Sequence, residues 1–283
     1  MNSRFVVFVA LLTLFAFGSL LASTDKEQEM VNQFLKKTET KHAQKLSWMS
    51  VGVSLDRINR KNDYNSFTMS LNHQIDGGQF SWLGNATAIN AEFGAFVKNG
   101  LAWSIGGEYW MKVGEKLSGN ITYAPSGGVP TVLTNPSSEI KTLGFYTSLA
   151  YYLKNAPKPG KPITGVSFFV GGTVGYYQTN WDLFSEYQNL NLSTAAPDGA
   201  NTTFKGSAPG FSANLGVDFP IQFGGLILSG EASYLHLNFN NIAWYNSVDQ
   251  EVVATYAGST DTRVDIALSG VRAKVNLKKY FSW

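Results

Sequence analysis

The chain has 283 residues, enough for one large domain or two small ones. Charged residues make up 15% of it, well below the usual level of about a quarter, and the net charge of +2 gives no case for a nucleic-acid partner. There are no cysteines, which excludes disulfide frameworks, thiol nucleophiles and cysteine-ligated zinc. The hydrophobic fraction is an ordinary 44%, so the apolar residues are not concentrated into long spans.

The first 23 residues have the pattern of a secretory signal peptide. Arg4 supplies the positive charge, residues 5–21 are mainly apolar, and the chain turns abruptly polar after Ser23. We therefore predict cleavage after Ala22 or Ser23, with an uncleaved membrane anchor as the alternative. Residues 24–44 are polar and favour a helix, which predicts a periplasmic tether.

From residue 45 onward, apolar residues recur at every second position. The stretch MSVGVSLD (49–56) shows the pattern, with apolar side chains on one face of an extended strand and small or polar side chains on the other. In the last such segment the apolar face shifts after Ser269 and Gly270, which predicts a bulge. The candidate strands are 45–57, 64–75, 86–97, 101–112, 139–153, 163–180, 204–222, 225–240 and 262–283.

Alternating strands occur in soluble sandwiches and in membrane barrels, and the two differ in what the polar face carries. Here that face is rich in Gly, Ser and Asn, which suit the crowded interior of a narrow barrel, whereas a sandwich exposes Lys, Glu and Thr to water. About ten tilted residues at ~3.3 Å each span an apolar band of ~25 Å. We therefore predict an all-β, closed, antiparallel up-and-down transmembrane β-barrel over 45–283.

The number of strands follows from a parity argument, because single-chain bacterial barrels have an even number. If 64–75 belongs to a first outer loop, eight strands remain, and the connections 98–100, 154–162 and 223–224 all become periplasmic. If 101–123 instead splits near Gly114, there are ten strands. Eight strands give the simpler solution. The long outer connections are then 58–85, 113–138, 181–203 and 241–261.

Several segments resemble the small outer-membrane β-barrel superfamily, which includes outer membrane protein A and the opacity-type surface proteins. They are EFGAFVKNGLAWSIGGEY (92–109), GFYTSLAYYLKN (144–155), VSFFVGGTVGYY (166–177) and the closing KKYFSW. The resemblance covers roughly 45–283 and implies a Gram-negative outer-membrane protein. Its implied partners are outer-membrane lipid and lipopolysaccharide, together with the secretion and barrel-assembly machinery during biogenesis.

The last residues resemble the signal that the assembly machinery reads in this superfamily. Val275, Leu277, Phe281 and Trp283 fit its pattern of alternate apolar residues ending on an aromatic, whereas Lys279 departs from it. We expect deletion of Trp283, or the change Phe281→Asp, to lower the surface yield sharply. Normal folding of both variants, measured by heat-modifiable migration in gels, would contradict this expectation.

The charged residues on the polar faces form the best polar constellation in the sequence. They either line a narrow pore or pair with one another inside the lumen, which is just wide enough for side chains when a barrel has eight strands. Both signs are present and buried charges need partners, so mutual neutralisation is favoured. The residues are Glu92, Glu108, Asp218, Glu231, Arg263, Arg272 and Lys274.

Aromatic residues are frequent in the predicted outer loops. They form either a patch for a ligand or host surface, or girdle residues in the lipopolysaccharide interface, and the sequence leaves both readings open. They are Trp82, Trp181, Phe184, Tyr187, Trp244 and Tyr245.

No pattern in the chain predicts catalysis or a cofactor. Of the three histidines, only His236 has a carboxylate that a loop could bring near it, Asp249, and no nucleophile completes the arrangement. No metal spacing or phosphate loop is present. We predict a structural or surface-interaction barrel that acts through its outer loops and whose ligand the sequence does not identify. A small porin-like channel for solutes or apolar molecules is the alternative.

Overall fold

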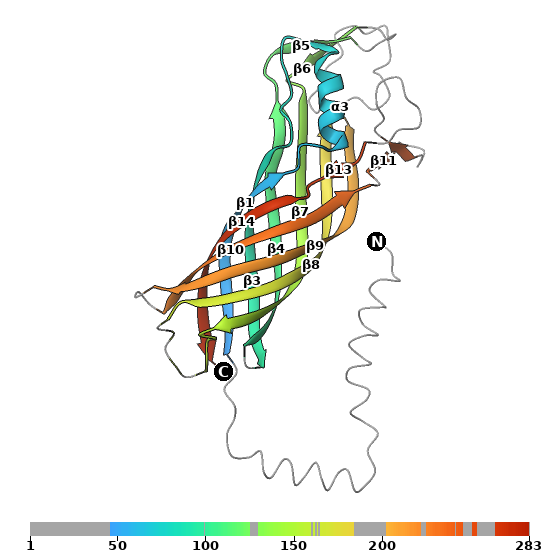
Figure 1. The fold of residues 1–283 in the computed structure, drawn as a ribbon. Coiled ribbons are helices and arrows are strands. Elements are labelled where there is room, and N and C mark those ends of the chain that lie inside the picture. The colour runs from blue at the N-terminus through green and yellow to red at the C-terminus, as the bar shows by residue number, and fades with distance from the viewer. Residues whose placement is uncertain are drawn as a thin grey trace, which may run out of the picture. The chain divides into compact units, whose positions relative to one another are not determined.

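Eight long strands pair in chain order and close into a barrel in the computed structural model (Figure 1). Every neighbouring pair is antiparallel, and β14 pairs with β1 to close the ring. The structure describes residues 46–98, 100–124, 130–159, 161, 163, 165–183, 202–221, 225–240, 242–245, 251–253 and 264–282. The barrel strands are β1 (Leu46–Ile58), β3 (Asn85–Lys98), β4 (Leu101–Lys116), β7 (Ser137–Lys154), β8 (Ser167–Leu183), β9 (Thr202–Pro220), β10 (Leu226–Phe239) and β14 (Gly270–Ser282).

The eight-stranded prediction is confirmed, and the ninth candidate segment, 64–75, is not a strand. It contains helix α3 (Asp63–Asn72), whose N-cap Asn62 accepts a hydrogen bond from the backbone of Asn65 at 2.9 Å. Tyr64, Thr68 and Leu71 of this helix are buried at helical spacing. Tyr64 and Thr68 are also an even number of positions apart, so the same stretch could be read as an alternating strand. Ten strands are excluded because β4 continues past Gly114 and stays paired with β7.

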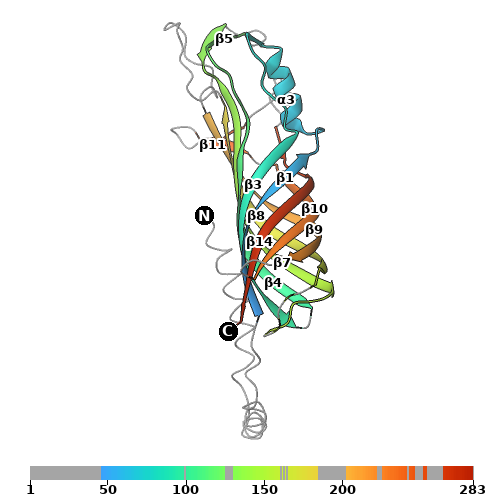
Figure 2. The ribbon, with the colours of Figure 1, turned by 90° about the vertical axis from the view of Figure 1, so that its left-hand side faces the viewer.

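The two ends of the barrel differ, and we name them by their connections. The turn end carries the short links after β3, β7 and β9, the start of β1 and the end of β14. The loop end carries α3 and a separate three-stranded sheet of β2 (Ile75–Asp76), β5 (Asn120–Tyr123) and β6 (Thr131–Thr134) (Figure 2). The short strands β11 (Ala243–Tyr245) and β12 (Glu251–Val253) extend from β9, and β13 (Ile266–Ala267) pairs with β10.

The outer face of the strands is apolar and exposed, whereas the inner face is polar and buried. In β1, Val51 is 62% exposed while the neighbouring Ser50 is 4% exposed. Tyr109, Tyr176 and Tyr234 are the last exposed aromatics of the outer face of their strands toward the loop end. A soluble sandwich buries its apolar faces, so this reversed arrangement is that of a transmembrane β-barrel with aromatic edges.

Within the described part of the chain, none of the helices combines the length and the hydropathy that a membrane crossing requires.

Glycines on the inner face make room for large aromatic rings. A Cβ atom on Gly94 would lie 2.1 Å from the ring of Trp48, and one on Gly216 would lie 2.2 Å from the ring of Phe169. Likewise, a Cβ on Gly144 would lie 2.3 Å from the ring of Tyr177. The polar face of the sequence is therefore rich in glycine because each of these rings occupies the space that a side chain on the neighbouring strand would need.

Candidate functional site

An arginine with two carboxylates lies toward the loop end of the lumen. Arg272 on β14 donates through Nε to Asp56 on β1, and its Nη1 donates to both carboxylate oxygens of Glu108 on β4 at 3.1 and 2.9 Å. The guanidinium carbon lies 5.0 Å from the centre of the Trp110 ring. All three charged side chains are at most 7% exposed. One cation faces two carboxylates, so the three charges neutralise one another only in part. The buried carboxylates depend on their hydrogen bonds to the guanidinium for stabilisation.

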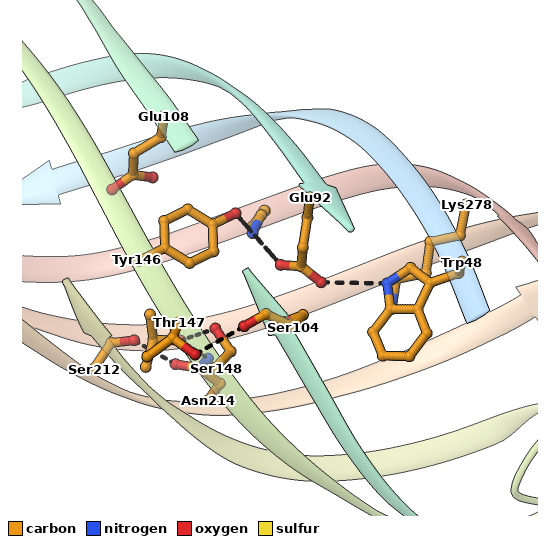
Figure 3. A network of polar contacts seen from close by, with 12 residues as sticks. Trp48, Glu92, Ser104, Glu108, Tyr146, Thr147, Ser148, Ser212, Asn214 and Lys278 are labelled. Carbon is orange, nitrogen blue, oxygen red and sulfur yellow. Dashed lines mark hydrogen bonds and ion pairs between the residues drawn. The ribbon is translucent and has the colours of Figure 1, made fainter. Parts of the chain in front are cut away.

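A second group surrounds Glu92 near the middle of the lumen (Figure 3). The indole Nε1 of Trp48 donates to Glu92 Oε1 at 3.3 Å, and the Tyr146 hydroxyl donates to Oε2 at 3.3 Å. Lys274 Nζ lies 3.8 Å from the same carboxylate and donates to the Tyr146 hydroxyl at 3.2 Å. Glu231 is the register partner of Lys274 on the next strand. Glu92 is thus held by side chains from three other strands.

A third group and its aromatic surroundings close the turn end. Asp218 on β9 accepts hydrogen bonds from Lys278 at 3.1 Å, from the Tyr152 hydroxyl at 2.8 Å and from the Tyr280 hydroxyl at 3.1 Å. The Tyr152 ring packs against Phe169 with a centroid distance of 5.3 Å. The cluster also contains Trp48, Ala102, Phe96, Ala150, Ala156 and Tyr280.

The loop end of the lumen is filled by a larger apolar cluster, which helix α3 completes. The hydroxyl of Tyr64 on α3 is 2.7 Å from Ser138 Oγ, and the indole of Trp181 donates to the same oxygen at 3.1 Å. The Tyr64 and Trp181 rings meet edge-on with centroids 5.4 Å apart. Burial raises the pKa of Tyr64 to about 12, so its hydroxyl keeps its proton at neutral pH. Phe80, Leu83, Trp110, Leu133, Ile140, Phe204, Leu237, Phe239 and Ile266 are further members.

Between these two apolar clusters the lumen holds a cavity of about 30 Å³. That volume is on the scale of one or two water molecules. The Oδ1 atom of Asn276, whose side chain lines it, has no protein hydrogen-bond partner, which suits a bound water. Beside it, Asn214 donates to Thr173 Oγ1 at 2.8 Å and Ser148 lies 2.7 Å from the same hydroxyl. Side chains of the two apolar clusters and of the three ion groups therefore occupy much of the described lumen.

The structure brings six of the seven sequence-predicted lumen charges to the inner face, and Arg263 lies outside the described residues. Sequence reasoning missed Asp56 and Lys278, both of which carry ion pairs. Strand alternation could have found them, because Asp56 follows Ser54 on the inner face and Lys278 follows Asn276. The six predicted charges that the structure places on the inner face are Glu92, Glu108, Asp218, Glu231, Arg272 and Lys274.

The predicted outer-loop aromatics divide into different environments. Trp82 is 54% exposed at the loop end. Placing Trp181 in an exposed loop was wrong, because β8 continues to Leu183 and alternation turns the indole into the interior, where it is completely buried. Phe184 and Tyr187 lie outside the described residues. Only the backbone of the β11 residues Trp244 and Tyr245 is described.

The residues of the predicted assembly signal lie at the end of β14. Val275, Leu277 and Phe281 face outward and are 36–48% exposed, while Trp283 lies outside the described residues. Lys279 shares that outward face near the turn end, where a long side chain can reach the membrane interface. The role of these residues in assembly stays a prediction.

The described residues contain no group of three or more histidine, aspartate or glutamate side chains placed to hold a metal. His236 is exposed on the outer face of β10, which points it away from the lumen. Asp249, its only candidate partner, lies outside the described residues.

The closed eight-stranded barrel, with its apolar belt and filled polar interior, has the architecture of the small outer-membrane barrels. No protein-family model matches the chain, and no curated protein matches it. Neisserial surface protein A is a similar solved structure, with 10% identity, a TM-score of 0.37 and coverage of 84% of this chain and 97% of that chain. Ail, the attachment invasion locus protein of Yersinia pestis, matches in its complex with sucrose octasulfate at 9% identity and a TM-score of 0.39, covering 84% and 99%.

A TodX deltaS2S3 mutant monoaromatic hydrocarbon channel is also similar, with 9% identity, a TM-score of 0.23 and coverage of 87% of this chain and 91% of that chain. Similarities this distant carry no argument about what the present chain binds or transports.

Proposed function

We propose that this protein is a sealed outer-membrane barrel that presents its loop end at the cell surface, in a structural or interaction role. Residues 1–23 direct its export and 24–44 form a periplasmic tether in this proposal. The side chains inside the lumen are the observation that carries it: an apolar cluster lies toward each end, the three ion groups lie along the interior, and the cavity beside the turn-end cluster measures about 30 Å³, the scale of one or two water molecules. The porin-like alternative requires an open lumen, so it is the less supported of the two.

The proposal predicts that the pure, folded protein gives no stable conductance in planar lipid bilayers. The Arg272, Glu92 and Asp218 groups hold side chains from several strands together, so the side chains inside the lumen should stay in place under an applied potential. An open porin measured in the same bilayers is the control for insertion. Large open-channel currents that change when Glu92 or Arg272 is neutralised would favour the channel instead.

The absence of cysteine allows a clean test of orientation. We expect the single variant Trp82→Cys, at the loop end, to react with a membrane-impermeant maleimide on intact cells. Lys158→Cys, in the link between β7 and β8 at the turn end, should react only after the outer membrane is permeabilised. The reverse order of labelling, or recovery of the protein in the cytoplasm, would contradict the proposed location.

A further inference from the structure

The apolar belt contains a shallow groove with a volume of about 590 Å³. It lies where Ala91 on β3 and Gly107 on β4 sit directly opposite each other, so that two small residues interrupt a face of large ones. A hydrocarbon chain suits such a depression better than a flat belt, because it gains contact on its sides as well as its base. The larger lining side chains are Val51, Val53, Ile89, Tyr109 and Leu143.

Three basic residues lie beyond the belt on the same side of the barrel. Arg57 is on the outer face of β1, four residues or about 13 Å along the strand from Val53 toward the loop end. Arg60 and Lys61 follow in the next turn, where the Arg60 side chain reaches Gly84 just before β3. All three are exposed, and none forms an ion pair in the part of the chain that the structure describes. Basic side chains without an ion-pair partner at the edge of an apolar belt are placed to attract anionic lipid headgroups.

We propose that the groove and these three bases together bind one phosphate-bearing lipid, with an acyl chain in the groove and the phosphate at Arg57, Arg60 and Lys61. The inference rests on the proposed orientation, which puts the loop end in the outer leaflet. The occupant is then the phosphorylated glycolipid of that leaflet, lipopolysaccharide. The positive charge of the three basic residues is complementary to the lipid phosphate. The apolar groove lies on the membrane side of these residues, just as the acyl chains of such a lipid lie on the membrane side of its phosphate.

The test is native mass spectrometry of the folded, full-length protein in detergent, titrated with lipopolysaccharide that lacks its outer sugars. We expect one bound lipid per barrel. Changing Arg57, Arg60 and Lys61 together to Gln should weaken binding about tenfold or more. The matched control removes three exposed lysines at the turn end, Lys98, Lys154 and Lys158, and should bind as the unchanged protein does.

The groove is tested separately by filling it. Gly107→Leu adds a side chain where the nearest atoms to a new Cβ are 3.6 Å away, so the barrel should accept it, while lipid binding falls about tenfold. Gly230→Leu, also on the outer face but on β10, has its nearest contact at 3.8 Å and should leave binding unchanged. Ala91→Leu provides a second groove-filling variant if the first folds poorly, as judged by heat-modifiable migration.

Three results would overturn the lipid site. They are equal affinity for both triple variants, unchanged binding after the groove is filled, and equal binding of a dephosphorylated lipid. None of them bears on the sealed barrel or its orientation, which the conductance and cysteine-labelling experiments test in the same preparations. A failure of the lipid site is thus distinguishable from a failure of the proposed function.

Discussion

Replacing Arg272 by alanine should destabilise the folded barrel by about 3–5 kcal/mol, because it leaves two buried carboxylates without their cation. Asp56 and Glu108 both receive hydrogen bonds from this one guanidinium, and their side chains are 5% and 1% exposed. The measurement is the free energy of unfolding in urea, followed by tryptophan fluorescence of barrels refolded into lipid vesicles.

Two further variants separate lost pairing from lost packing. Lys279→Met removes an outward-facing base from the same strand and should change the unfolding free energy little. Arg272→Met combined with Asp56→Asn and Glu108→Gln removes the whole charge set and should recover most of the loss. If Arg272→Ala costs no more than Lys279→Met, the carboxylates do not depend on the arginine and the ion group is not what holds this part of the lumen.

Gly216→Val should prevent the barrel from folding or destabilise it by about 3 kcal/mol or more. Phe169 is the cross-strand partner of Gly216, and its ring covers the glycine so closely that a Cβ would lie 2.2 Å from it. The ring cannot easily retreat, because it packs against Tyr152 on its other strand neighbour. The yield of heat-modifiable folded protein and its urea midpoint measure the effect.

The control for this change is Gly230→Val on the adjoining strand β10. Its Cβ would point to the outer face with its nearest neighbour at 3.8 Å, so folding should be close to normal. Adding Phe169→Ala to Gly216→Val should restore much of the folded yield by removing the clashing ring. Equal behaviour of the two valine variants would show that inner-face glycines are not required for ring packing.

The alternation of apolar and polar residues determined the fold class, because in a strand the direction of each side chain depends on position alone. From it followed the barrel and the inward direction of Glu92, Glu108 and Arg272. The bulge predicted after Ser269 and Gly270 was wrong, because β13 and β14 keep one register against β10. The even-numbered Val264, Ile266 and Leu268 are apolar because they are buried in the loop-end cluster on the inner face. The same local rule misread 64–75, since Tyr64, Thr68 and Leu71 also fit a helix. The capping by Asn62 and tertiary contacts such as the packing of Tyr64 on Trp181 favour that helix.

Which charges pair was decided by the tertiary structure alone. Arg272 lies 216 residues from Asp56 and 164 from Glu108 along the chain, and the three meet only because β14 closes on β1. Closure of eight strands also narrows the lumen, whose cavity beside the turn-end cluster is about 30 Å³, where a wider barrel would hold a channel. The pattern of a strand specifies the direction in which each side chain points. The partner that the side chain reaches depends on the diameter of the barrel and on the register between strands, and the sequence of one strand determines neither.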